Sequence, residues 1–402
     1  MLDAAFAPDD QGCALTDIGV AADGSVAFVA AAGEGLQSPG PLIELSGRQV
    51  WPGLVELHAH IDKAGTAERT FSPEGTLDAA REAAKRDRLT PWTHEDAWGR
   101  MDWALNAAYG HGTVALRTHL DSQADRADPT WSIWPELRRA WAGRIELQAV
   151  ATLGVAKLAG GYGEEICERA AGLGARLGPV VYRSPALDAE LTRAFDLADA
   201  FGLELDFHVD ETDDPEARGL RRIAELALER GFTRRIVCGH ACSLASHSDE
   251  EAAQTIALVR QAGIGVVSLP ANNLYLQGRA PGRTPSWRGV TRIKELRAAG
   301  VPVAIGGDNC QDAFYPFGDN DMLDVFRDAV RIAHLDYPFA GWVDAVSAIP
   351  GTLMGLGTRG RVATGSPADL IIFEQTSAIG VLATPGRPRL VVRAGLSLDV
   401  TD

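Results

Sequence analysis

From about residue 51 the chain alternates short apolar runs with longer amphipathic stretches, and this alternation limits the fold more than any other feature. Each run has the length of a buried strand, and the segments between them, such as 190–201, 220–230 and 250–262, repeat apolar residues at helical spacing. Eight strand–helix units over about 300 residues predict an α/β fold, a (β/α)8 TIM-like barrel. The expected strands are 54–60, 113–119, 147–152, 179–183, 203–208, 235–240, 265–269 and 303–307.

A doubly wound parallel sheet is the alternative reading of this pattern. We favour the barrel because polar residues suited to chemistry end several different strands, as they do in barrel enzymes. No glycine-rich nucleotide-binding fingerprint follows any of the runs. The two chain ends, residues 1–50 and 356–402, have β texture broken by turns. We therefore expect them to form one small β-sandwich beside a barrel domain of residues 51–355.

Bulk composition excludes some classes of partner. The chain has 402 residues, a formal charge of −16 and a pI near 5.0, so no basic stripe is available to bind nucleic acid. The five cysteines have no paired spacing, and Cys238 and Cys242 around His240 lack a second Cys/His pair to complete a zinc knuckle. We expect reduced thiols in a cytoplasmic protein with no membrane partner, since no signal-like segment or 18-residue apolar run occurs.

The run at 54–60 ends in His58-Ala59-His60. Strand side chains alternate faces, so the two imidazoles point the same way and can hold one metal ion between them. Two histidines at this spacing also arise by chance or at an ordinary strand end. The interpretation of this pair as metal ligands therefore depends on residues further along the chain.

Three other strands end in residues that complete a metal hydrolase site. His208 ends the fifth strand as a third metal ligand, and Glu211 follows at the strand mouth, within reach of a water on the metal. His240 ends the sixth strand and Asp308 follows the eighth, offering a second imidazole at the rim and a carboxylate ligand. Each alone has an ordinary explanation, such as a helix cap for the aspartate. Together they predict a site at one end of the barrel.

These residues carry a resemblance to the amidohydrolase superfamily, and within it to the cytosine deaminase-like branch. The similarity runs from about residue 40 to 375, and the segments 276–279 and 315–318 are specific to this branch. The matching segments are 52–63, 117–121, 208–211, 273–279, 288–295, 308–309, 315–318 and 321–323.

The resemblance implies one divalent metal ion held by His58, His60, His208 and Asp308. Glu211 would shuttle protons, and His240 would orient the attacking water. The segment 179–183 supplies no lysine or glutamate to bridge a second ion, which also predicts one metal. Zinc is favoured, and iron(II) or manganese accept the same donors. Lys63 is interpreted as a loop or gating residue.

Two positions depart from relatives that deaminate cytosine. Those relatives place a pyrimidine-reading glutamine where this chain has Gly154, and an aspartate where it has Asn309. An amide side chain donates hydrogen bonds as well as accepting them, so we expect this site to bind a different ring from cytosine. We expect little activity on cytosine and more on another aminated ring. Gln277 and Asn309 are the expected polar readers at the rim, and Phe314, with Tyr315 and Phe317, the expected aromatic cover.

The function predicted is metal-dependent hydrolytic deamination of an aminated nitrogen heterocycle, a cytosine-like pyrimidine or related ring. Activated water would attack the amidine carbon, and ammonia would leave. The alternatives are release of an N-alkylamine from an aminotriazine, which an asparagine at position 309 also fits, and hydrolysis of a cyclic amide or imide. A non-catalytic relative is disfavoured because every ligand position is filled. The expected partner is a small heterocyclic substrate, and a homo-oligomer is compatible with the sequence.

Overall fold

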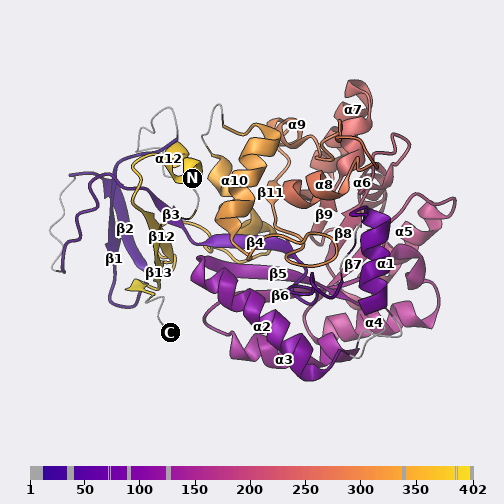
Figure 1. Ribbon diagram of the computed structural model, residues 1–402, viewed down its shortest axis with the longest axis horizontal. Helices are drawn as coiled ribbons and strands as arrows, with labels where there is room; N and C mark the ends of the chain where they lie inside the picture. The colour runs from indigo at the N-terminus through magenta and orange to yellow at the C-terminus, as the bar shows by residue number, and fades with distance from the viewer. Residues whose placement is uncertain are drawn as a thin grey trace.

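The computed structural model of the chain describes residues 12–33, 40–70, 72, 74–87, 92–123, 128–336, 341–384, 386 and 388–398. Its centre is a parallel eight-stranded sheet whose strand order follows the sequence (Figure 1). A bridge between Ala59 and Asp308 brings the first and last strands together, so the sheet nearly closes and the predicted barrel is confirmed. The strands are β4 (Leu54–Ala59), β5 (Thr113–Asp121), β6 (Glu146–Gly154), β7 (Arg176–Val181), β8 (Leu205–Val209), β9 (Ile236–His240), β10 (Gly265–Ser268) and β11 (Val303–Ile305).

Helices surround this sheet and connect its strands. The stretches expected at 190–201, 220–230 and 250–262 are the helices α5, α6 and α7. The helices are α1 (Leu77–Asp87), α2 (His94–Gly110), α3 (Asp128–Ala140), α4 (Gly161–Gly172), α5 (Leu187–Phe201), α6 (Gly219–Arg230), α7 (Asp249–Gln261), α8 (Pro270–Leu276), α9 (Ile293–Ala298), α10 (Met322–Ala333), α11 (Ala348–Leu353) and α12 (Ala378–Ala383).

Local sequence signals fix several helix ends. Ser248 and Glu251 form a capping box at the start of α7, in which each side chain accepts from the other's backbone N–H. Helices α5 and α6 end at Gly202 and Gly231, both in the left-handed conformation that glycine adopts without strain. These signals stop the helices where the chain turns back into the next strand.

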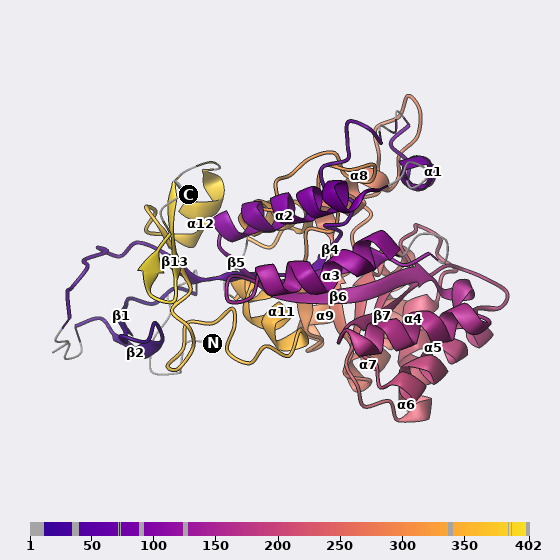
Figure 2. The same ribbon diagram turned by 90° about the horizontal axis from the view of Figure 1, so that it is seen from below.

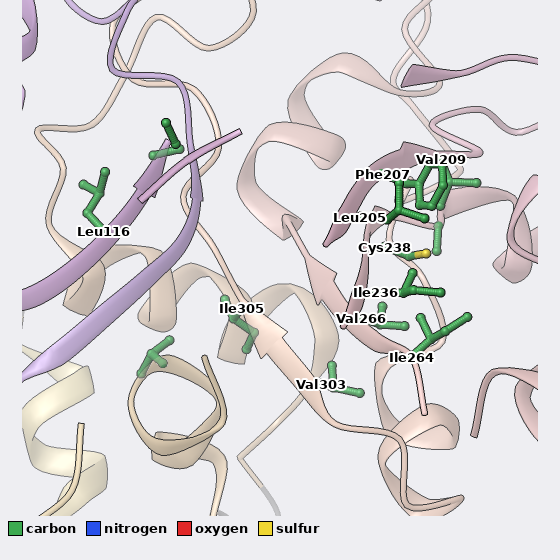
Figure 3. Packing of buried hydrophobic residues seen from close by; sticks show 14 of the residues in the cluster. Leu116, Leu205, Phe207, Val209, Ile236, Cys238, Ile264, Val266, Val303 and Ile305 are labelled. Atoms are coloured by element: carbon green, nitrogen blue, oxygen red, sulfur yellow. The ribbon is translucent and has the colours of Figure 1, made fainter. Parts of the chain in front are cut away.

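Successive side chains of each strand point to opposite faces of the sheet, and this separates the hydrophobic core from the site. Phe207, Cys238 and Ile305 are fully buried in the main hydrophobic cluster, and Figure 3 shows Leu205, Phe207 and Val209 lying together along β8. The residue between two of them, His208, points to the opposite face of the sheet. The outward positions therefore pack on helices, while the inward ones are free to carry polar groups.

A second cluster fills one end of the barrel interior. It joins Ala115, Val237, Val267 and Ala304 of four strands to Leu353 of α11. Because apolar side chains fill that end of the interior, the polar site lies toward the carboxyl ends of the strands.

The chain ends form two antiparallel sheets rather than a single one. Strands β1 (Thr16–Val20) and β2 (Val26–Ala31) pair with each other, and β3 (Val50–Pro52) joins β12 (Leu370–Phe373), β13 (Arg389–Arg393) and β14 (Leu396–Ser397). Backbone hydrogen bonds such as Val26 N to Ser366 O link the two ends, which lie beside the barrel in Figure 2. One small sandwich with boundaries at 50 and 356 stays a prediction, and residues 1–11, 34–39, 385, 387 and 399–402 of its segments lie outside the described residues. Among the described helices, none combines the length and apolarity needed to cross a membrane.

Candidate active site

The four candidate metal ligands meet at the carboxyl ends of their strands, although they are up to 250 residues apart in sequence (308 − 58 = 250). His208 Nε2 lies 3.2 Å from His58 Nε2 and 3.1 Å from His60 Nε2. Asp308 Oδ1 lies 3.6 Å and 3.3 Å from the same two imidazole nitrogens. All four residues are buried, and one ligand atom from each falls within 4.8 Å of the others. The structure thus brings together the set that the sequence predicted.

The protonation states of this set suit a cation. Burial and the neighbouring imidazoles hold the pKa of His58 and His208 well below the usual value, so both rings are neutral and keep a lone pair. Burial acts to raise the pKa of Asp308, but His60 and His240 outweigh it and hold that pKa below its usual value. The site therefore presents neutral nitrogens and one carboxylate.

The donor geometry fits one small divalent ion. Ligands about 2.1 Å from a tetrahedral centre lie about 3.4 Å from one another, close to the spacings between these four groups. Asp308 Oδ1 is buried without a hydrogen bond among the described residues. A buried carboxylate oxygen facing imidazole lone pairs is costly unless a cation lies between them. Nitrogen and oxygen donors of this kind suit zinc, iron(II) or manganese.

His240 and Glu211 lie beside this cluster. His240 Nδ1 is 3.7 Å from Glu211 Oε1, and the amide nitrogen of Asn273 donates to the same Nδ1 at 3.0 Å. Because the Asn273 amide nitrogen can only donate, Nδ1 is assigned as the acceptor and the ring proton to Nε2, which is buried and has no partner in the part of the chain described. His240 is therefore held as a hydrogen-bond donor. Burial raises the pKa of Glu211, although His240 opposes the rise, so this carboxyl is suited to taking up and returning a proton.

The backbone at these strand ends is strained. His240 and Asp308 have φ of 68° and 65°, values that non-glycine residues seldom adopt. Gly239 is required beside them, because a Cβ there would lie 2.9 Å from His58 Cε1. Such strain persists where the surroundings hold it, and here it turns two side chains toward one point.

Glu56 ties the first strand to the last. Its carboxylate accepts from the backbone N–H of His58 at 2.8 Å and of Gly307 at 2.7 Å. A Cβ at Gly307 would lie 2.7 Å from Glu56 Oε2. Burial raises the pKa of Glu56 to about 8. This carboxyl group closes the barrel next to two metal ligands.

A second polar network lies deeper, beneath the candidate ligands. Arg117 donates to Asp206 Oδ2 at 2.6 Å and to Gln148 Oε1 at 3.1 and 2.8 Å. The ring of His119 stacks on that of His58, with centroids 3.9 Å apart. Together with Asp206 these histidines offer a further set of metal-ligand atoms. The guanidinium group already neutralises Asp206, so this network suits support of the ligands better than a second cation.

Another acidic cluster, at the surface, does not resemble a metal site. His111, Asp319 and Asp321 lie close together, but Arg389 donates to Asp321 at 2.7 Å. An arginine paired with the carboxylate opposes a cation there.

The four residues expected to contact substrate lie around the same rim. Gly154 ends β6. Gln277 donates to the backbone oxygen of Glu211 at 3.3 Å, and the Asn309 amide donates to Asp312 at 2.6 Å. Phe314 is half-buried, with the Lys63 ammonium 5.4 Å from its ring centre. Their contacts with a substrate stay a prediction.

Three residues of this rim were not assigned a role from the sequence. Asn273 fixes His240, the half-exposed Tyr182 follows β7, and Arg81 of α1 covers its ring. Asn273 falls within a segment that carries the family resemblance, so that segment was the available signal. Nothing in the spacing of Arg81 or Tyr182 indicates that they meet.

Comparison with known proteins finds similarity along nearly the whole chain. The model described as "Amidohydrolase family" matches residues 141–396. A pterin deaminase of Rhizobium rhizogenes is 41% identical over 395 residues, which cover 98% of this chain and 90% of the relative. The solved 5-methylcytosine deaminase of Klebsiella pneumoniae is 26% identical with a TM-score of 0.84, covering 96% of this chain and 94% of that one. The N-isopropylammelide isopropylaminohydrolase of Burkholderia multivorans, 24% identical with a TM-score of 0.77 over 98% and 96% of the two chains, shares the fold.

Proposed function

This chain belongs to the amidohydrolase family, and we propose that it removes the exocyclic amine of a pterin. Metal-dependent hydrolytic deamination of a nitrogen heterocycle is the reaction that the family, the relatives and the residue cluster support together. The similarity to a pterin deaminase along nearly the whole chain carries the choice of ring. The glycine at position 154 agrees with it, because a two-ring substrate needs room that a glutamine would occupy.

In this proposal His58, His60, His208 and Asp308 hold one divalent ion, zinc by preference. Bound there, such an ion would lower the pKa of water from about 15.7 toward about 7 and so supply the nucleophile at neutral pH. The donor set includes the neutral imidazoles of His58 and His208 and the carboxylate of Asp308, as the directions of their pKa shifts indicate.

Glu211 carries the proton in this scheme. As the carboxylate it takes one proton from the attacking water and, as the acid, gives it to the ring nitrogen. It then takes the second proton, from the hydroxyl on the ring carbon, and gives it to the departing amine as the carbonyl forms. Its raised pKa favours uptake, and its position 3.7 Å from His240 keeps it beside the reacting centre. Ammonia leaves once the amine is protonated.

His240 acts on the oxygen that adds to the ring carbon. Because the Asn273 amide occupies Nδ1, the Nε2–H of the His240 ring is free to donate. A donor fixed before the reaction stabilises charge that develops on that oxygen without reorganising during the step. Asn273 is thus a positioning residue in this proposal.

Ammonia release from pterin, cytosine and isoguanine, together with isopropylamine release from N-isopropylammelide, tests the proposal. The full chain, loaded with zinc and freed of excess metal, should act on pterin with a kcat/KM at least ~10²-fold above that for cytosine, since a site that pairs with one ring rejects another that lacks its groups. Glu211→Gln should keep the metal and lose at least ~10²-fold in kcat. His208→Ala should lose both. Cytosine turnover as efficient as that of pterin would refute the choice of ring, and unchanged metal content in His208→Ala would refute the ligand set.

A further inference from the structure

The rim of the site is open where β6 and β7 end. Gly154 is the last residue of β6, and a Cβ built there would meet Tyr182 Cε2 at 3.9 Å and Lys157 Cγ at 3.8 Å, which are ordinary contacts. Tyr182 directly follows β7 (Arg176–Val181), and 46% of the residue is exposed. A glycine next to a half-exposed aromatic ring leaves a flat face available to a ligand.

This corner carries positive charge. The Arg81 guanidinium lies 4.9 Å from the centre of the Tyr182 ring, and α1 lies in front of β7 and β8 in Figure 1. Arg81 pairs with Asp78 of its own helix at 3.2 Å, but that carboxylate is 91% exposed and the pair is weak. Arg81 therefore has donors to spare, and its contact with the ring aims it over the rim.

The corner belongs to the reaction site electrostatically. Burial raises the pKa of Tyr182, while Arg81 and Lys63 oppose the rise and Glu211 adds to it. Arg81 also acts to lower the pKa of Glu211. Arg81 thus acts on both Tyr182 and Glu211, so this corner lies close to the carboxyl that the proposed reaction uses.

We propose that the corner formed by Gly154, Tyr182 and Arg81 binds the second ring of the substrate together with a carboxylate on that ring. This inference rests on the proposed function, which places the aminated carbon near Glu211. The ring that bears the leaving amine then lies over the candidate metal ligands, and the ring remote from it extends across Gly154 onto the face of Tyr182. A carboxylate at the far edge accepts from the guanidinium of Arg81, and the ammonium of Lys63 adds to the attraction.

The chemistry of the corner favours an anion over a neutral substituent. The chain has a formal charge of −16, so an anionic ligand is repelled by the surface as a whole. The Arg81 guanidinium over Tyr182 and the Lys63 ammonium over Phe314 are two cations of the rim, and their charge offsets that repulsion locally. A bidentate guanidinium–carboxylate pair also fixes the orientation of the ring plane.

The experiment compares kcat/KM for pterin-6-carboxylate, 6-hydroxymethylpterin and pterin with the zinc-loaded full chain. The carboxylated pterin should be preferred over both others. Arg81→Met keeps an apolar chain over Tyr182 but removes the charge, and it should reduce the ratio of kcat/KM for the carboxylated to the unsubstituted pterin at least ~10-fold. Lys85→Met removes a charge from the exposed face of the same helix, 65% exposed at its side chain, and should leave that ratio unchanged. An unchanged ratio in Arg81→Met, or a wild-type preference for the neutral rings, would overturn the inference.

A binding measurement separates this inference from the proposed function. Calorimetric titration of zinc-loaded Glu211→Gln with the same three pterins needs no turnover. A preference for the carboxylate that disappears when Arg81→Met is added supports the corner even if no pterin is deaminated by the wild type. Deamination of pterin with no such binding preference overturns the corner and leaves the proposed function intact. Failure to bind any of the three overturns both.

Discussion

Replacing Arg117 by methionine should destabilise the barrel through the buried partner it leaves behind. Arg117 and Asp206 are both within 1% of complete burial, and the guanidinium lies 2.6 Å from the carboxylate. The same guanidinium supplies two N–H groups to Gln148 Oε1. Methionine fills much of the aliphatic volume, so packing changes little and the loss of charge and donors dominates.

The structure sets the size of the effect. Removing one partner of a buried ion pair costs about 3–5 kcal/mol, because the other charge stays buried and unpaired. Asp206 is already costly to ionise, since burial raises its pKa to about 6 even with Arg117 beside it, a shift equivalent to about 3 kcal/mol. Without Arg117 that pKa rises further, and protonation of the carboxyl limits the total. We expect the free energy of unfolding to fall by about 3–5 kcal/mol at pH 8.

The pH dependence of the free energy of unfolding shows whether the unpaired Asp206 carboxylate causes the loss of stability. In the wild type the folded protein keeps the Asp206 proton up to about pH 6 while the unfolded chain releases it at lower pH, so this group lowers stability as pH rises to about 6 and no further. In Arg117→Met the decline continues above pH 6. The difference in stability between the two proteins should therefore be larger at pH 8 than at pH 5.5.

Urea unfolding followed by tryptophan fluorescence measures these differences, with metal removed from every sample. Arg117→Met combined with Asp206→Leu should recover most of the loss, since no buried charge remains. Arg234→Met serves as the matched control, because Arg234 pairs with Asp199 on the surface and its loss should cost no more than about 1 kcal/mol. A loss below about 1 kcal/mol for Arg117→Met at pH 8, or a double variant whose loss equals the sum of the single ones, would refute the reasoning.

Three further predictions concern the site itself. Gly239→Ala should weaken metal retention at least ~10-fold in dialysis against a chelator, because the new Cβ would displace the ring of His58; retention equal to wild type would contradict the geometry. Metal-free wild type should lose up to about 5 kcal/mol of stability as pH rises from 4.5 toward 8, because folding raises the pKa of Glu56 to about 8. Urea unfolding of Glu56→Gln should show a flatter dependence of stability on pH. Asn273→Ala should lower kcat about 10-fold, and Asn273→Asp more, because a carboxylate draws the His240 proton to Nδ1; equal kcat values for the two variants would count against the tautomer assignment.

Periodicity and strand-end residues were enough to predict the barrel and its candidate ligands. Strand register follows from alternation, so a histidine two residues from another shares its face whatever the surrounding structure. The positions of the helix ends were less certain, and β11 proved short, ending at Ile305 before Asp308. The chain ends were also harder to predict, because short strands such as β3 take their partner from a segment about 320 residues away, as in the pair Trp51 and Ile371.

By itself, the sequence determined which residue types stand at the ends of which strands, and hence the candidate donor set His58, His60, His208 and Asp308. Only the tertiary structure decided which groups support that set. The amide of Asn273 on His240, and Arg81 over Tyr182, join segments that no local pattern relates. Spacing along one strand is imposed by the geometry of the backbone, whereas a contact between loops of different strands depends on how the whole barrel closes.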